Sequence, residues 1–111
     1  MILMIKLNIK PLSVNEAWQG KRYRTQKYKS YQDFVLLLLP KIEIPSGYLE
    51  IHLIFGFSSK LADFDNPVKL FVDILQKKYQ FNDKMIKRAV IEVEHVEKKK
   101  EFIKFEIKQW K

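Results

Sequence analysis

Two aspartates separated by a single residue are the part of this sequence with the clearest chemical potential. Asp63 and Asp65 follow a segment that predicts a strand, and side chains at positions i and i+2 of an extended backbone point the same way. Mg²⁺ prefers hard oxygen ligands, usually one or two carboxylates together with water and substrate phosphate. Two carboxylates this close repel each other unless a cation lies between them. The pair therefore predicts a magnesium site.

Residues further along the chain can complete that site. Lys69 and Asp73 follow Asp65 with the spacing i, i+4, i+8, which places the three side chains on one side of a helix. A lysine beside a metal-bound phosphate stabilises the charge that develops in the transition state. Asp83 comes after this helix, and a short return of the chain would bring it back to the acidic pair. We therefore expect Asp83 to join the two aspartates as a third metal ligand.

The same residues also have purely structural interpretations. Asp65 or Asn66 can cap the helix that begins there. Lys69 and Asp73 can form an ordinary surface ion pair worth about 0.3 kcal/mol, and Asp83 can be a turn residue. A D-x-D pattern taken alone favours the capping interpretation.

Hydrophobic spacing predicts the elements that position these residues. Apolar residues alternate with polar ones in four segments, which we interpret as strands over residues 1–9, 48–57, 90–96 and 101–108. A first helix is expected over residues 30–39, because Pro40 ends it. A second helix is expected from Asn66 as N-cap and Pro67 as first helical residue to about Gln80.

The remaining segments are expected to be irregular. Residues 10–30 are interpreted mostly as a loop, and residues 97–100 as a charged hairpin turn. The resulting order is β-α-β-α-β-β, which predicts an α/β (α+β) fold with a mixed four-stranded sheet and two main helices.

Composition limits the class of protein. The chain has 111 residues, of which 47% are hydrophobic, and this predicts one small domain over residues 1–111. It has 0 Cys, which excludes disulfides and thiolate zinc sites and suits the cytoplasm. Its apolar segments are too short to span a membrane, so no membrane partner is expected. The formal charge of +8 favours a polyanionic partner, nucleic acid above all.

Basic and aromatic residues gather between residues 20 and 31, where no acid occurs. Phosphate contacts need Lys and Arg, and tyrosine rings can stack on unpaired bases. The candidate DNA contacts are Lys21, Arg22, Arg24, Lys27 and Lys29. The alternative is a solvated loop whose tyrosines anchor the next helix.

The acidic pattern also resembles a known family. The run D-x-D-N-x-x-K, followed by an Asp after the helix, is similar to the RusA family of Holliday junction resolvases. The matching residues are Asp63, Asp65, Asn66, Lys69 and Asp83. In the N-terminal part, a loop after the first strand also resembles that family through Pro11, Ser13, Asn15 and Trp18.

This resemblance implies a homodimer that cleaves four-way DNA junctions by paired symmetric nicks, with Mg²⁺ as cofactor, in DNA recombination and repair. It implies that Asp63, Asp65 and Asp83 are metal ligands. It further implies a catalytic role for Lys69 and a DNA contact for Asn15. Two other functions stay open: a non-catalytic nucleic-acid-binding module, and a nuclease acting on other branched DNA. A small RNase is a weaker alternative, and no role is assigned to His52, His95 or Asn82.

Overall fold

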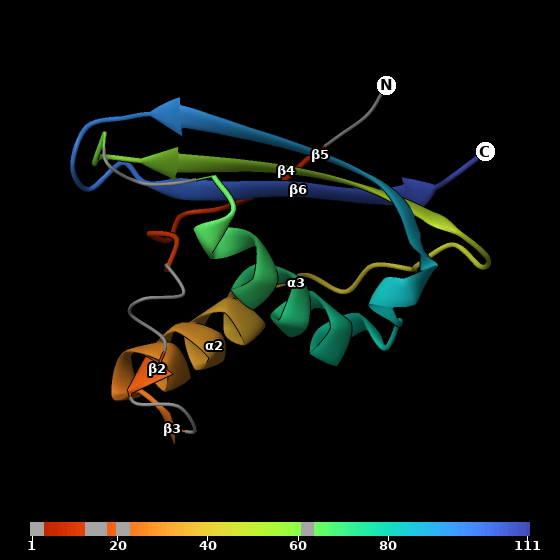
Figure 1. The fold of residues 1–111 in the computed structure, drawn as a ribbon, viewed down its shortest axis with the longest axis horizontal. Helices are drawn as coiled ribbons and strands as arrows, with labels where there is room; N and C mark the ends of the chain where they lie inside the picture. The colour runs from red at the N-terminus through yellow and green to blue at the C-terminus, as the bar shows by residue number, and fades with distance from the viewer. Residues whose placement is uncertain (1–3, 13–17, 20–22, 61–63) are drawn as a thin grey trace.

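A computed structural model describes residues 4–12, 18–19, 23–60 and 64–111. A four-stranded mixed sheet forms one layer, and the two main helices of the described residues lie together on one of its faces (Figure 1). The main elements in chain order are β1 (Ile5–Leu7), α2 (Gln26–Leu38), β4 (Leu49–Phe57), α3 (Asn66–Tyr79), β5 (Ile86–His95) and β6 (Phe102–Gln109). This arrangement confirms the predicted α+β class and the order β-α-β-α-β-β. Within the described ranges, no helix combines the length and the hydrophobicity needed to cross a bilayer.

The sheet has the strand order β1-β6-β4-β5. β4 pairs with β5 in parallel and with β6 antiparallel, so β5 is an edge strand. The predicted hairpin over residues 97–100 is therefore wrong. A turn does form there, with the Lys100 N–H donating to the Glu97 carbonyl at 3.0 Å, but β4 lies between the two strands that it connects. The charged residues 97–100 indicate a turn, but they do not indicate which strands pair.

The core lies between the sheet and the helices. Alternate residues of β4 face the helices, as the alternation in the sequence predicted, and Phe55 among them is fully buried. Phe71 of α3 lies edge-on to the rings of Phe55 and Phe105, with centroid distances of 6.2 and 5.7 Å. Burying a side chain of this size contributes about 1.5–3 kcal/mol, so this aromatic group fixes α3 on the sheet.

Helix α2 begins earlier than the sequence analysis expected, at Gln26 instead of residue 30. Thr25 is the reason, because its side-chain oxygen accepts the N–H of Tyr28 at 3.2 Å and so caps the helix. The preceding segment also contains two short paired strands, β2 (Trp18–Gln19) and β3 (Tyr23–Arg24). The expectation of a loop over residues 10–30 is wrong in these places.

Other boundaries also differ from the prediction, among them the end of β1, which is Leu7 instead of residue 9. The N-cap position of α3 is Asp65, one residue before the predicted Asn66, and Asn66 is the first helical residue. β5 begins at Ile86 instead of residue 90. A short 3-10 helix, η1 (Asp83–Met85), connects α3 to this strand.

Gly56 of β4 lies opposite Phe102 of β6 on the face of the sheet away from the helices. A Cβ atom at Gly56 would lie 2.4 Å from a ring carbon of Phe102. Gly56→Ala should therefore destabilise the protein by about 1 kcal/mol, although an alanine in a strand normally gains about 0.5–1 kcal/mol over glycine. The urea-unfolding midpoint measures the change. Adding Phe102→Leu should remove the overlap, so the double variant should lose less stability than the two single variants lose together. A loss equal to that sum, or larger, would contradict this packing.

Candidate functional site

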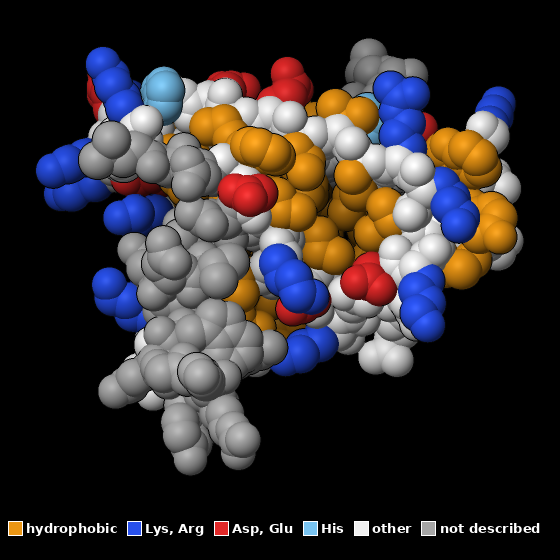
Figure 2. Space-filling model, in the orientation of Figure 1, with side chains coloured by type: hydrophobic (Ala, Val, Ile, Leu, Met, Phe, Trp, Pro, Cys, Tyr) orange, Lys and Arg blue, Asp and Glu red, His pale blue; other side chains and the backbone are white. Residues whose placement is uncertain are grey.

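A surface hollow with a volume of about 300 Å³ lies between α3 and the edge strand β5. We call it the acidic hollow, and its lining residues are Asp65, Val68, Lys69, Val72, Asp73, Asp83 and Ile91. The valines and the isoleucine are half-buried, whereas the first and last aspartates and the lysine are exposed. On this face of the molecule, acidic and basic side chains surround a hydrophobic patch (Figure 2). Four of the residues singled out in the sequence thus border one depression.

Asp65 and Asp83 border this hollow at opposite ends. α3 runs from the end of the sheet where β4 finishes to the end where β5 begins, and η1 follows there (Figure 1). The backbone N–H of Asp83 is bonded to the side chain of Gln76, which is roughly 16 Å further along the helix axis than Asp65. Carboxylates that share Mg²⁺ each bind it at about 2.0–2.1 Å. The hollow therefore contains both residues without bringing them to one point.

The acid pair itself is described only in part. Asp63 lies outside the described residues, so its place beside Asp65 stays a prediction. In the part of the chain that the structure describes, no three His, Asp or Glu side chains form a group that could hold a metal. Asp65 is therefore the described carboxylate around which a cation site with Asp63 would form. Such a donor set fits Mg²⁺, which commonly takes one or two carboxylates and completes its shell with water and phosphate.

The carboxylate of Asp65 is not used for helix capping. Asp65 occupies the N-cap position of α3, but its side chain makes no capping hydrogen bond. Its backbone is helical, with φ −85° and ψ −20°, whereas a capping residue is normally extended. The capping interpretation of Asp65 is therefore wrong. The positive end of the α3 dipole favours a negative charge at this place, which is consistent with an exposed carboxylate.

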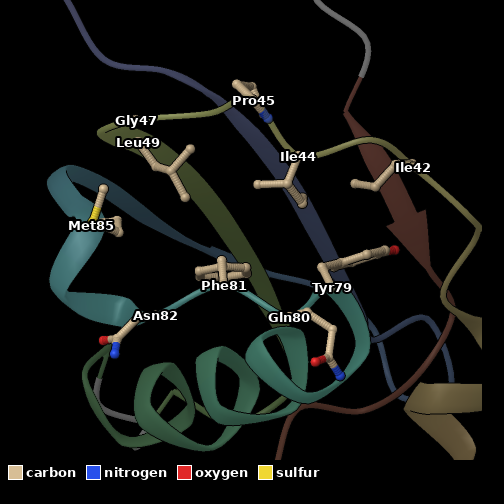
Figure 3. Close-up of a pocket in the computed structure, with 10 residues that line it drawn as sticks. All are labelled: Ile42, Ile44, Pro45, Gly47, Leu49, Tyr79, Gln80, Phe81, Asn82 and Met85. Atoms are coloured by element: carbon tan, nitrogen blue, oxygen red, sulfur yellow. The ribbon is translucent and has the colours of Figure 1, made fainter.

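The chain that leaves α3 is anchored by aromatic residues. Gln80 adopts a left-handed conformation, with φ 61°, and ends the helix. The hydroxyl of Tyr79 donates to the Pro40 carbonyl at 2.6 Å, and burial raises the pKa of Tyr79 to about 12. Figure 3 shows Phe81 and Tyr79 beside Ile44 in a second hollow of about 460 Å³. These contacts hold the segment from which Asp83 extends.

Asn82, to which the sequence analysis gave no role, starts η1. Its side-chain oxygen accepts the N–H of Lys84 at 2.9 Å and so caps this short helix. The turn bond over the same residues runs from the Met85 N–H to the Asn82 carbonyl at 2.9 Å. Asn82 thus makes the side-chain bond that shapes the turn, and Asp83 lines the acidic hollow.

Gln76 is a residue that the sequence analysis missed. Its side-chain oxygen accepts the N–H of Asp83 at 2.9 Å, and its amide nitrogen donates to Asp73 Oδ1 at 3.4 Å. Asp73 Oδ1 also lies 3.4 Å from Lys69 Nζ. Gln76 therefore connects the η1 turn to the polar side of α3. The available signal was its position three residues after Asp73 and seven after Lys69, which places it on the same side of the helix.

Lys69 forms the surface pair that was considered as its structural alternative. Its side chain is 72% exposed, and its ammonium group lies 3.4 Å from Asp73 Oδ1. An exposed i, i+4 pair contributes only a few tenths of a kcal/mol, so it directs Lys69 without holding it firmly. Because Lys69 also lines the acidic hollow, its ammonium group remains near any phosphate that binds there.

The basic segment of residues 20–31 is described only in part. Three of the predicted DNA contacts, Asn15, Lys21 and Arg22, lie outside the described residues. Arg24 belongs to β3, and Lys27 and Lys29 are exposed on α2. Their contact with DNA stays a prediction.

Two tyrosines of the same segment have a structural role. Tyr28 and Tyr31 are 1% and 6% exposed and pack into the core from α2. The interpretation that tyrosines anchor the helix is therefore confirmed for this pair. Neither ring is available to stack on a base.

His52 lies in a charged cluster on the sheet face away from the helices. Its Nε2 is 2.5 Å from Glu50 Oε2, and Arg88 and Lys108 each approach the same carboxylate to 3.7 Å. The hydrogen bond from His52, followed by the charges of Lys108 and Arg88, lowers the pKa of Glu50. These contacts give His52 a structural environment outside the acidic hollow.

The chain matches no protein-family model and has no significant match among the curated proteins. The interpretation of the site therefore depends on its own residues and their geometry.

Gln76→Ala should free the backbone N–H of Asp83. Losing one hydrogen bond of about 1 kcal/mol should make that amide exchange with solvent about five to ten times faster. Hydrogen exchange followed by NMR measures this directly, and amides of β4 should not change. Gln26→Ala is the matched control, because the Gln26 side chain donates to Ser30 on the surface of α2, away from the η1 turn. Unchanged exchange at Asp83 in the Gln76 variant would show that this bond does not hold the turn.

Proposed function

We propose that this protein is a Mg²⁺-dependent, structure-specific DNA endonuclease that resolves four-way junctions by paired symmetric nicks as a homodimer. One observation carries the proposal. Asp65 lies at the start of α3 with a carboxylate that makes no capping bond, beside Lys69 on the border of the acidic hollow. The resemblance of the D-x-D-N-x-x-K run to the RusA family points to the same chemistry.

The chemistry would take place at the Asp65 end of the hollow. Asp63 and Asp65 would hold Mg²⁺ there, leaving positions for water and for the scissile phosphate. Bound Mg²⁺ would polarise a phosphoryl oxygen and lower the pKa of an attacking water. Lys69 supplies a positive charge to the phosphate oxygens as their negative charge grows. Asp73, which is bonded to Gln76, directs that lysine through a weak surface pair.

Binding of the same ion by Asp83 would require a change in the structure. In this structure Asp83 borders the far end of the acidic hollow and is connected to α3 through Gln76. If Asp83 is a third metal ligand, the distance between Asp65 and Asp83 would have to decrease when DNA and Mg²⁺ bind. The proposal therefore includes a movement of η1 towards the start of α3, which would break the bond between the Asp83 N–H and Gln76.

The net charge supports a DNA partner, and the dimer is part of the proposal. The formal charge of +8 attracts the phosphate backbone and accelerates encounter with it. Paired nicks need two active sites, and a two-fold dimer presents them to matching strands of a junction. A non-catalytic binding module is the rival, but it assigned the acids to helix capping, which Asp65 does not perform.

The decisive substitution is Asp65→Asn, which removes a metal-binding charge and keeps the shape. Cleavage of a four-way junction in Mg²⁺ should fall by about 100-fold or more, while binding in Ca²⁺ survives. Asp33→Asn, at an exposed carboxylate of α2 outside the hollow, is the matched control and should cleave normally. Asp83→Asn tests the proposed movement, since an equal loss is expected if Asp83 becomes a ligand.

Other outcomes separate the alternatives. Cleavage at the native rate by the Asp65 variant would overturn the metal assignment. A native protein that binds four-way, flap and linear DNA without cleaving any of them would be the non-catalytic module. Faster cleavage of flaps than of four-way junctions would keep the chemistry and change the substrate.

A further inference from the structure

A third hollow, with a volume of about 560 Å³, lies at the end of the sheet where β4 and β5 finish. We call it the basic hollow, and its lining includes Lys6, Ser58, Lys60, His95, Lys100 and Phe102. These residues come from β1, from the segment after β4, and from both sides of the β5–β6 connection. Lys and Arg side chains gather at this end of the molecule, at the left of the view (Figure 2).

Positive charge in the basic hollow exceeds negative charge. Lys6, Lys60 and Lys100 all line it, and Glu97 is the one acid among its described lining residues. Glu97 pairs with Lys100 at 3.8 Å, but both side chains are exposed, at 83% and 73%, so solvent screens the pair. A concave surface with several cations of one sign concentrates its electric field and attracts anions.

The aromatic ring of Phe102 gives this hollow a fixed wall. Phe102 is only 5% exposed and packs on Gly56, where no side chain separates ring and backbone. The ammonium groups of Lys6 and Lys104 each lie 5.1 Å from the ring centroid, within the range of cation–π attraction. This attraction restricts the lysine side chains before a ligand arrives, which lowers the entropy cost of binding an anion.

The basic hollow and the Asp65 end of the acidic hollow both lie towards the end of the sheet where β4 and β5 finish, but Lys6 and Phe102 line the basic hollow from the face away from the helices. Ile91 lines the acidic hollow and His95 lines the basic one, and both belong to β5, where four residues span roughly 13 Å. His95 also pairs with Phe57, the last residue of the strand that leads to Asp65. Successive phosphates of one DNA strand are about 3.4 Å apart along the duplex axis. A DNA strand with one phosphate at Asp65 would therefore reach the basic hollow after several nucleotides if it passes around the end of the sheet.

We propose that the basic hollow binds backbone phosphates of the DNA strand that continues from the scissile phosphate. This inference rests on the proposed nuclease function for the position of the strand. The ligand chemistry is phosphodiester, and the contacts are made by Lys6, Lys60 and Lys100. Because these contacts carry no base recognition, they contribute affinity and register without sequence preference.

The test compares two triple variants with the same loss of charge. One carries Lys6→Gln, Lys60→Gln and Lys100→Gln; the control changes Lys41, Lys78 and Lys111, which are exposed outside the basic hollow, to Gln. Binding of a four-way DNA junction in Ca²⁺ is measured by fluorescence anisotropy from low to high salt. The slope of log K against log[salt] should fall by about 2–3 in the first variant and by less than about 0.5 in the control.

The outcomes distinguish this inference from the nuclease proposal. Equal slopes for the two variants would overturn the inference, whether or not the native protein cleaves DNA. A reduced slope in the first variant, in a native protein that never cleaves, would support the phosphate site and reject the nuclease. Circular dichroism of both variants confirms that they are folded before binding is compared.

Discussion

The parallel pairing of β5 with β4 is the constraint on which the rest of the structure depends. Parallel neighbours cannot be joined by a tight hairpin, so the chain has to cross the sheet and return. α3 makes that crossing, and Phe71 fixes it on the sheet against Phe55 and Phe105. The acidic hollow is a consequence, because it lies where the polar side of this crossing helix meets the edge strand. Asp65 lies at the start of α3, at one end of the hollow, and Asp83 follows the end of α3, at the other end.

Structural and chemical tasks are divided among different polar residues. Thr25 and Asn82 cap helices, and Gln76 ties the η1 turn to α3. Asp65, by contrast, makes no capping bond although it lies at the N-cap position. Lys69 is mostly exposed and makes only a weak surface pair. Asp65 and Lys69 therefore have little part in holding the fold together, and their side chains are accessible to a cation and to phosphate.

Much of the fold follows from periodicity, while the pairing of its strands does not. Alternation along β4 and the helical spacing after Asn66 were sufficient to predict both elements, because each depends on neighbours close in sequence. The charged turn over residues 97–100 was predicted as part of a hairpin and is not one, since strand pairing depends on distant contacts. The same limit on prediction from sequence applies to the site. The sequence brings Asp65 and Lys69 together through helical spacing, but the place of Asp83 depends on the direction of the crossover.

The central claim is that the carboxylate of Asp65 binds a divalent cation in the acidic hollow. Crystals of the protein soaked in Mn²⁺, which shares the oxygen ligands of Mg²⁺, test it through the anomalous signal of the metal. The account predicts one strong peak within bonding distance of Asp65 and Asp63. A well-ordered crystal with no peak at Asp65, or with its manganese held only by other residues, would contradict the account.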